Sequence, residues 1–287
     1  MSDPPEVAGE SPWPTGRQQL TLDLPGSPLE VFTHRRAASE RGPLLVVFHG
    51  VLRNAETYRD HTVALADRLG SPLAAPLFDL ARFPTARYQQ GGLLRDGELQ
   101  PRSEWSFSLI PALLTELRRR LGDPQRPVLL LGHSGGGQFL VRLAAMQPLA
   151  VQRIVAANPG TLLFPDLANP WPFGMGGLPG EIAHEQALRS YLACPLTLYL
   201  GTGDTVRDEN LDVTAAADRQ GMTRYERGRR AYFRGLELAR QWNVPFGWRL
   251  IEAVGVPHDH EQMFNHPACL TSLAASERGA EPPRQQR

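Results

Sequence analysis

The 287-residue sequence contains very little cysteine and no long apolar run. Its two cysteines, Cys194 and Cys269, show no spacing typical of a metal site, and two buried thiols in a reducing cytoplasm are expected, with a single disulfide as the alternative. Asp259 and His260 are adjacent candidate ligands, but no third ligand accompanies them, so we expect no metal.

No apolar stretch has the length of a membrane span, and residues 1–16 lack the basic start and apolar centre of a signal peptide. We therefore expect a cytoplasmic protein without a membrane anchor.

The sequence also lacks an excess of charge of either sign. Basic and acidic residues number 30 each, and the formal net charge at pH 7 is zero. Such a balance gives no reason to expect nucleic acid or an anionic membrane surface as a partner. The hydrophobic content of 41% in a chain of this length suffices for a sizeable core. The oligomeric state cannot be read from the composition.

Short apolar runs alternate with segments of helical periodicity along most of the chain. Segments 18–24 and 29–33, separated by a Pro-Gly-Ser-Pro turn, predict an antiparallel hairpin at a sheet edge. Strands alternating with helices predict a parallel sheet with right-handed crossovers. The apolar runs typical of buried parallel strands are 44–48, 72–78, 128–131, 151–157, 195–200 and 248–254. The expected helices are 55–69, 106–121, the segment after 136, 181–192, 225–242 and 261–275.

No linker rich in proline, glycine or serine divides the chain, so we expect one domain over residues 17–275. The polar ends, 1–16 and 276–287, are expected to be disordered. An irregular stretch at 79–101 has the length of a functional loop. A second irregular stretch, 158–182, is apolar and aromatic. It is either a lid or pocket wall, or a proline-braced crossover that covers the core.

One stretch carries a specific chemical signature. The buried strand 128–131 leads directly into Gly132-His133-Ser134-Gly135-Gly136, which is followed by helical periodicity. A strand, Gly-x-Ser-x-Gly and a helix in this order predict a nucleophile elbow, with Ser134 lifted off the strand end. Gly132 and Gly136 leave room for the close approach of backbone in such a turn. The N–H of Gly135 can stabilise a developing oxyanion.

Ser134, Asp204 and His258 each follow a predicted parallel strand at its carboxyl end, where sites on such sheets are built. We predict that they form a nucleophile, orienting acid and base. Asp208 lies on the same loop as Asp204 and is the alternative acid. His260 is the alternative base, although His258 is nearer the strand end.

The order serine, acid, histidine is that of the α/β-hydrolases, and the chain resembles this superfamily over nearly all of residues 17–275. Phe-His-Gly-Val-Leu-Arg-Asn at 48–54 and Gly-His-Ser-Gly-Gly-Gly at 132–137 resemble the bacterial polyhydroxyalkanoate-depolymerase-like and feruloyl-esterase-like serine esterases. The resemblance implies a mostly parallel eight-stranded sheet with an antiparallel N-terminal edge and helices on both faces. It also implies cleavage of carboxylic esters through an acyl-enzyme, without metal or cofactor, in an oxyanion hole formed by the N–H groups of Gly135 and Val51.

Because the sequence shows no export signal, a small intracellular ester is the expected substrate rather than a polymer. A serine peptidase or amidase of the same fold is the alternative, and a non-catalytic binding protein is a third hypothesis. His49 and His133 are expected to brace the strand ends. The residues expected to contact substrate are Leu52, His133, Phe164, Trp171 and Phe173.

Overall fold

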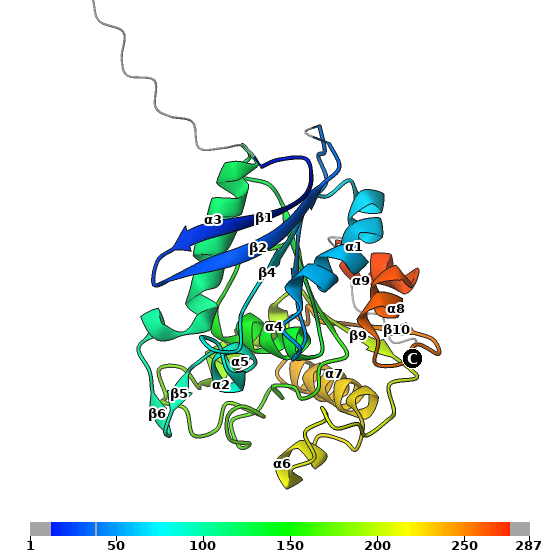
Figure 1. The fold of residues 1–287 in the computed structure, drawn as a ribbon. Coiled ribbons are helices and arrows are strands. Elements are labelled where there is room, and N and C mark those ends of the chain that lie inside the picture. Colours follow the sequence, from blue (N-terminus) through cyan, green and yellow to red (C-terminus); the bar gives the residue numbers. More distant parts are fainter. Residues whose placement is uncertain (1–12, 38, 276–287) are drawn as a thin grey trace, which may run out of the picture.

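The computed structural model describes residues 13–37 and 39–275. Eight of its strands form one sheet in the order β1-β2-β4-β3-β7-β8-β9-β10 (Figure 1). β2 pairs antiparallel with β1 and β4, and the remaining neighbours pair parallel, which confirms the expected sheet. The strands are β1 (Gly16–Leu24), β2 (Ser27–Arg35), β3 (Leu44–Phe48), β4 (Leu73–Pro76), β7 (Val128–His133), β8 (Arg153–Ala157), β9 (Leu196–Gly201) and β10 (Arg249–Ala253).

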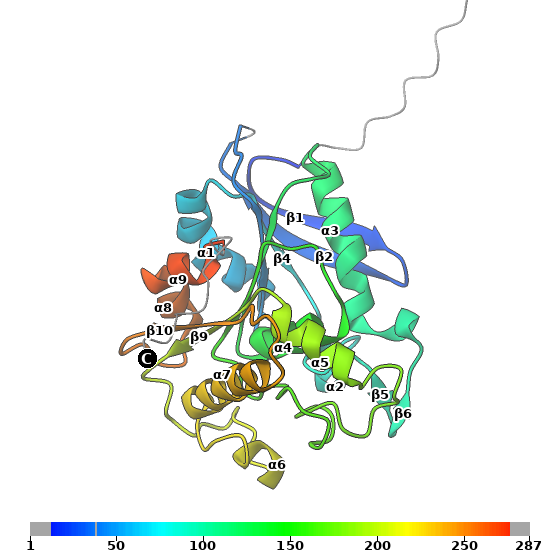
Figure 2. The same ribbon diagram turned by 180° about the vertical axis from the view of Figure 1, so that it is seen from behind.

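Helices cover both faces of the sheet. Figure 1 shows α1, α8 and α9 together on one side and α3 on the other, and Figure 2 shows the same layers from behind. The first group is α1 (Ala55–Leu69), α8 (His260–Asn265) and α9 (Ala268–Leu273). The second group is α3 (Leu109–Arg120), α4 (Gly135–Met146), α5 (Glu185–Ala193) and α7 (Arg224–Gln241). The loops carry the short elements α2 (Thr85–Tyr88), β5 (Leu94–Arg95), β6 (Glu98–Leu99) and α6 (Ala215–Asp218), and two 3₁₀ turns at Arg102–Glu104 and Ser106–Ser108.

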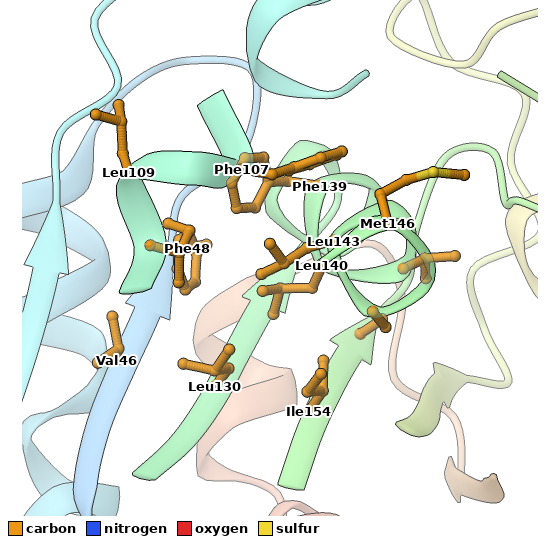
Figure 3. Close-up of a cluster of buried hydrophobic side chains, with 14 of the residues drawn as sticks. Val46, Phe48, Phe107, Leu109, Leu130, Phe139, Leu140, Leu143, Met146 and Ile154 are labelled. Atoms are coloured by element: carbon orange, nitrogen blue, oxygen red, sulfur yellow. The ribbon is translucent and has the colours of Figure 1, made fainter. Parts of the chain in front are cut away.

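Alternation along the central strands gives each face of the sheet its own core. Leu130 packs into the cluster beneath α3 and α4, whereas its neighbours Leu129 and Leu131 pack into the cluster beneath α1, α8 and α9. Figure 3 shows the first cluster, in which Leu130 and Ile154 point from β7 and β8 toward Leu140 of α4. The sheet is therefore buried on both sides, as wholly apolar strands require.

Three expectations about the elements need correction. The segment 261–275 forms two helices rather than one, because Pro267 cannot continue a helix and His266 before it is extended. The stretch 79–101 is not a plain loop, since it contains α2 and the β5–β6 hairpin. Ordered structure begins before residue 17: Trp13 is 2% exposed and packs into the core under α3. The other residues expected to be disordered, 1–12 and 276–287, lie outside the described part of the chain.

Cys194 and Cys269 are free thiols, so the alternative of a single disulfide is wrong. Within residues 13–37 and 39–275, no helix combines the length and the apolar character needed to cross a membrane. The same residues contain no group of three or more His, Cys, Asp or Glu side chains arranged to hold a metal ion.

Candidate active site

Ser134 lies in the tight turn that joins β7 to α4. Its backbone has φ 54° and ψ −114°, a left-handed conformation that is uncommon for a residue with a side chain. The turn is held because the N–H of Ser134 donates to the carbonyl of Ala157 at 3.0 Å. A Cβ on Gly132 would lie 2.5 Å from the carbonyl oxygen of Gly136, and a Cβ on Gly136 would overlap that of Phe48. The two glycines therefore have the role expected of them in a nucleophile elbow.

Asp204 and His258 meet at the carboxyl ends of β9 and β10. The Nδ1 of His258 lies 2.7 Å from Oδ2 of Asp204, whose side chain is 1% exposed. A carboxylate only accepts hydrogen bonds, so Nδ1 carries the proton and Nε2 of the neutral ring is free to accept one. Asp208 instead accepts from both terminal nitrogens of Arg224, at 2.7 and 2.6 Å, and these bonds lower the pKa of its carboxyl group. Asp204, not Asp208, is the carboxylate that contacts the histidine.

Ser134 and His258 line the same cavity, which has a volume of about 260 Å³. Between these two described residues, no hydrogen bond joins the Ser134 hydroxyl to the imidazole in this structure. Catalytic hydrogen bonds are often long without substrate and shorten in the complex. The structure therefore places the Ser134 hydroxyl and the imidazole that contacts Asp204 around one small space.

Two backbone N–H groups lie close to Ser134, that of Val51, which lines the cavity, and that of the next residue in the chain, Gly135. A Cβ built on Gly135 would lie 3.3 Å from the nitrogen of Val51, so the two residues are in close contact. Among the described residues, neither the N–H of Gly135 nor that of Val51 has an intramolecular acceptor. Gly135 is also the first residue of α4, where the helix dipole favours negative charge. Free donors at this position are what an oxyanion hole requires.

His133 and His260 surround His258 but do not replace it. The ring of His260 stacks on Tyr58 at 4.0 Å, and its Nε2 lies 3.1 Å from Nδ1 of His61 rather than near a carboxylate of the site. Burial lowers the pKa of His260 to about 4. Nδ1 of His133 lies 3.3 Å from the Tyr58 hydroxyl, and burial lowers the pKa of His133 well below its usual value. Both rings are therefore neutral at pH 7, and His258 is the histidine that contacts Asp204.

The residues expected to contact substrate separate into three groups. Leu52 and His133 line the cavity of Ser134. Phe173 lines a second, adjoining cavity of about 560 Å³. Phe164 lines neither, and Trp171 is 8% exposed and packs into the core. Stretch 158–182 therefore mainly covers the core, with only a few of its residues reaching the second cavity.

Sequence reasoning missed several polar residues that line these cavities. Tyr58 lines the cavity of Ser134, Gln89 lines the second cavity, and Glu209 and Asn210 line both. They come from loops and from a helix without a recognisable motif. Glu209 and Asn210 lie on the loop after β9 that also carries Asp204, and this position is their only signal in the sequence.

Comparison with protein-family models and with curated protein sequences gives no match. Two solved structures are similar over most of their length. Poly(aspartic acid) hydrolase-1 from Sphingomonas sp. KT-1 is 32% identical, with a TM-score of 0.84 over 89% of this chain and 98% of that one. LpqC, a poly(3-hydroxybutyrate) depolymerase from Bordetella parapertussis, is 33% identical, with a TM-score of 0.83 over 92% of this chain and 93% of that one.

A more distant structure, MPT51 (FbpC1) of Mycobacterium tuberculosis, is 14% identical, with a TM-score of 0.56 over 90% of this chain and 97% of that one, and it shows the fold alone. The two closer structures share about a third of their residues with this chain over nearly their whole length. The chain belongs to the α/β-hydrolase superfamily, in the family of these two hydrolases.

Proposed function

We propose that this hydrolase cleaves carboxylic esters of small molecules, using Ser134 as nucleophile, His258 as base and Asp204 as the residue that orients the base. The observation that carries the proposal is the 2.7 Å contact between Asp204 and the Nδ1 of His258, beside a serine in a strained turn. That contact fixes the tautomer that leaves Nε2 able to take a proton. No step requires a metal, a cofactor, nucleic acid or a membrane.

The first half of the reaction forms the acyl-enzyme. The Ser134 oxygen bonds to the ester carbonyl carbon while its proton passes to Nε2 of His258. The carbonyl oxygen becomes an oxyanion that accepts hydrogen bonds from the N–H groups of Gly135 and Val51. When the intermediate collapses, the bond from carbon to the alcohol oxygen breaks, and His258 gives its proton to that oxygen.

The second half of the reaction releases the acid. Water attacks the acyl carbon, its proton passes to His258, and the bond to the Ser134 oxygen breaks as the proton returns to that oxygen. Asp204 remains a carboxylate throughout and stabilises the imidazolium that forms twice per turnover. A guanidinium nitrogen of the buried Arg224 lies 3.5 Å from Oδ1 of Asp204, so a positive charge stands beside this carboxylate.

Amide hydrolysis is the second candidate, because one similar structure is a poly(aspartic acid) hydrolase and the other a depolymerase of a polyester. The same residues would act on either bond. An ester is the less demanding substrate, since an alcohol oxygen leaves more readily than an amide nitrogen. Rates for a matched pair, p-nitrophenyl acetate and p-nitroacetanilide, decide between the two. Turnover of the anilide at a rate equal to that of the ester would favour the amidase.

The test of the proposed nucleophile is Ser134→Ala. Hydrolysis of p-nitrophenyl acetate should fall by about 10³-fold or more in kcat, while the far-UV circular dichroism spectrum stays unchanged. Ser190→Ala is the matched control, since Ser190 is exposed on α5, far along the chain from the elbow. A fluorophosphonate should label the wild type and the control but not the Ser134 variant. Wild-type rates in Ser134→Ala would refute the assignment, and absence of labelling in the wild type would favour a non-catalytic protein.

A further inference from the structure

The second cavity adjoins the first on the side of the oxyanion hole. Both are lined by Val51, Glu209 and Asn210, so a molecule bound over Ser134 extends into the second cavity without leaving the surface of the protein. Its other lining residues come from α2, α4 and the loops after β8 and β9. With about 560 Å³ against about 260 Å³, it is the larger of the two.

The position of the second cavity assigns it to one part of the substrate. Its lining includes Val51, an oxyanion donor, but neither His258 nor His260. The leaving alcohol must lie near Nε2 of His258, because it receives its proton there. The acyl part of the ester is therefore the part that reaches the second cavity.

The lining of this cavity is polar. Four amide side chains and three hydroxyls line it: Gln89, Gln90, Gln138, Asn210, Thr85, Thr161 and Thr214. Gln89 is 6% exposed, and its side-chain amide has no hydrogen-bond partner among the described residues. Its Nε2 lies 3.3 Å from the place of a Cβ on Gly135, beside the oxyanion hole. The amide is open to the cavity, where a polar group of the substrate can take its unused hydrogen bonds.

The charge of the lining is one-sided. Within the described residues, no arginine lines either cavity, and the sequence contains no lysine. Asp208 is paired with Arg224, and Asp212 lies near the buried guanidinium groups of Arg142 and Arg227. Glu209 forms no ion pair among the described residues and stands where the two cavities meet. Among the residues that line the two cavities, the charge without a partner is therefore negative.

We propose that the second cavity binds a polar or cationic acyl arm of the substrate, with Gln89 as its hydrogen-bonding residue and Glu209 as the residue that rejects anionic arms. This proposal rests on the proposed esterase function. It separates this chain from the similar poly(aspartic acid) hydrolase, because a polyanion would meet an unpaired carboxylate beside the nucleophile.

The experiment compares four p-nitrophenyl esters whose acyl arms have the same length and end in different groups: 6-aminohexanoate, 6-hydroxyhexanoate, heptanoate and the monoester of heptanedioate. At low ionic strength, kcat/KM should be about tenfold higher for the ammonium arm than for the carboxylate arm, and salt should reduce this ratio. The hydroxyl arm should be preferred over the methyl arm. Glu209→Gln should bring the ammonium-to-carboxylate ratio close to one, and Gln89→Leu should remove the preference for hydroxyl over methyl.

Asp23→Asn is the matched control, since it removes an exposed carboxylate on the edge strand β1 and should change neither ratio. Equal rates for all four arms in the wild type, or ratios that Glu209→Gln and Gln89→Leu leave unchanged, would overturn the proposed subsite. The heptanoate ester tests the esterase function alone. If Ser134→Ala hydrolyses it as fast as the wild type, the function fails, whereas Ser134-dependent hydrolysis without discrimination among the arms refutes only the subsite.

Discussion

At the scale of the residue, the buried side chain of His49 joins two loops at the strand ends and makes the stability of the protein depend on pH. It is fully buried at the end of β3, where Nδ1 lies 2.9 Å from the carbonyl oxygen of Gly50 and Nε2 lies 3.1 Å from the N–H of Phe78. A carbonyl only accepts and an N–H only donates, so Nδ1 carries the hydrogen and Nε2 accepts. A second proton on the ring would break the bond to Phe78. Burial accordingly lowers the pKa of His49 to about 4.

This lowered pKa predicts a loss of stability in mild acid. Below pH 6.5 the unfolded chain binds a proton at this histidine that the folded protein does not, so the free energy of unfolding falls as the pH drops from about 6.5 to 4. The share of His49 is about 3 kcal/mol over this range. Urea unfolding at several pH values measures the free energy of unfolding. Below pH 6.5 this free energy should fall less steeply with decreasing pH for His49→Gln than for the wild type, and above pH 7 the two proteins should show the same dependence on pH. Equal slopes below pH 6.5 would contradict the prediction.

At the scale of the element, the turn between β7 and α4 requires glycine at positions where a side chain would overlap neighbouring backbone. A Cβ added to Gly136 would overlap the backbone carbonyl of Phe48. This backbone belongs to a strand of the sheet and cannot move aside as the end of a flexible side chain could. Gly136→Ala should therefore lower the free energy of unfolding by at least about 2 kcal/mol and reduce the hydrolase activity, because the shift displaces Ser134. Gly180→Ala is the control, since a Cβ there meets nothing within 4 Å and the residue is exposed. Chemical denaturation of both variants measures the difference, and an equal loss in both would refute the steric argument.

The elements differ in how far the sequence could predict them. The central strands β3 and β7 carry uninterrupted apolar runs and β2 of the N-terminal hairpin alternates, so these elements follow from periodicity alone. The sequence predicts one helix over 261–275, but Pro267 lacks the N–H that a helix interior needs, and two helices form instead. Local chemistry overrides periodicity at that residue.

The site was predictable where strand ends define it. Ser134, Asp204 and His258 each follow a parallel strand, and the structure brings them to one edge of the sheet. The choice between Asp204 and Asp208 depends on Arg224 of α7, a partner that only the folded chain places beside Asp208. Gln89 and Glu209 could not be found, because no motif or period marks a loop residue that reaches the site through tertiary packing.

At the scale of the whole molecule, the two cores share their central strands. Leu130 and Leu131 of β7 are both fully buried, yet one belongs to the cluster under α3 and α4 and the other to the cluster under α1, α8 and α9. If the helices leave one face of the sheet, they expose strands whose other side chains form the core of the opposite face. We therefore expect the two cores to unfold together.

The tryptophans make this cooperativity measurable. All five of them lie on the α3–α4 side: four are buried in that cluster, and Trp242 is packed against it. Leu130→Ala and Leu131→Ala should each lower the free energy of unfolding by about 2–5 kcal/mol. If the cores unfold as one unit, Leu131→Ala must shift the transition seen by tryptophan fluorescence as much as the one seen by far-UV circular dichroism, although no tryptophan belongs to the cluster that it disturbs within the described residues. A shift in the circular dichroism transition alone would show that the two faces of the sheet unfold separately.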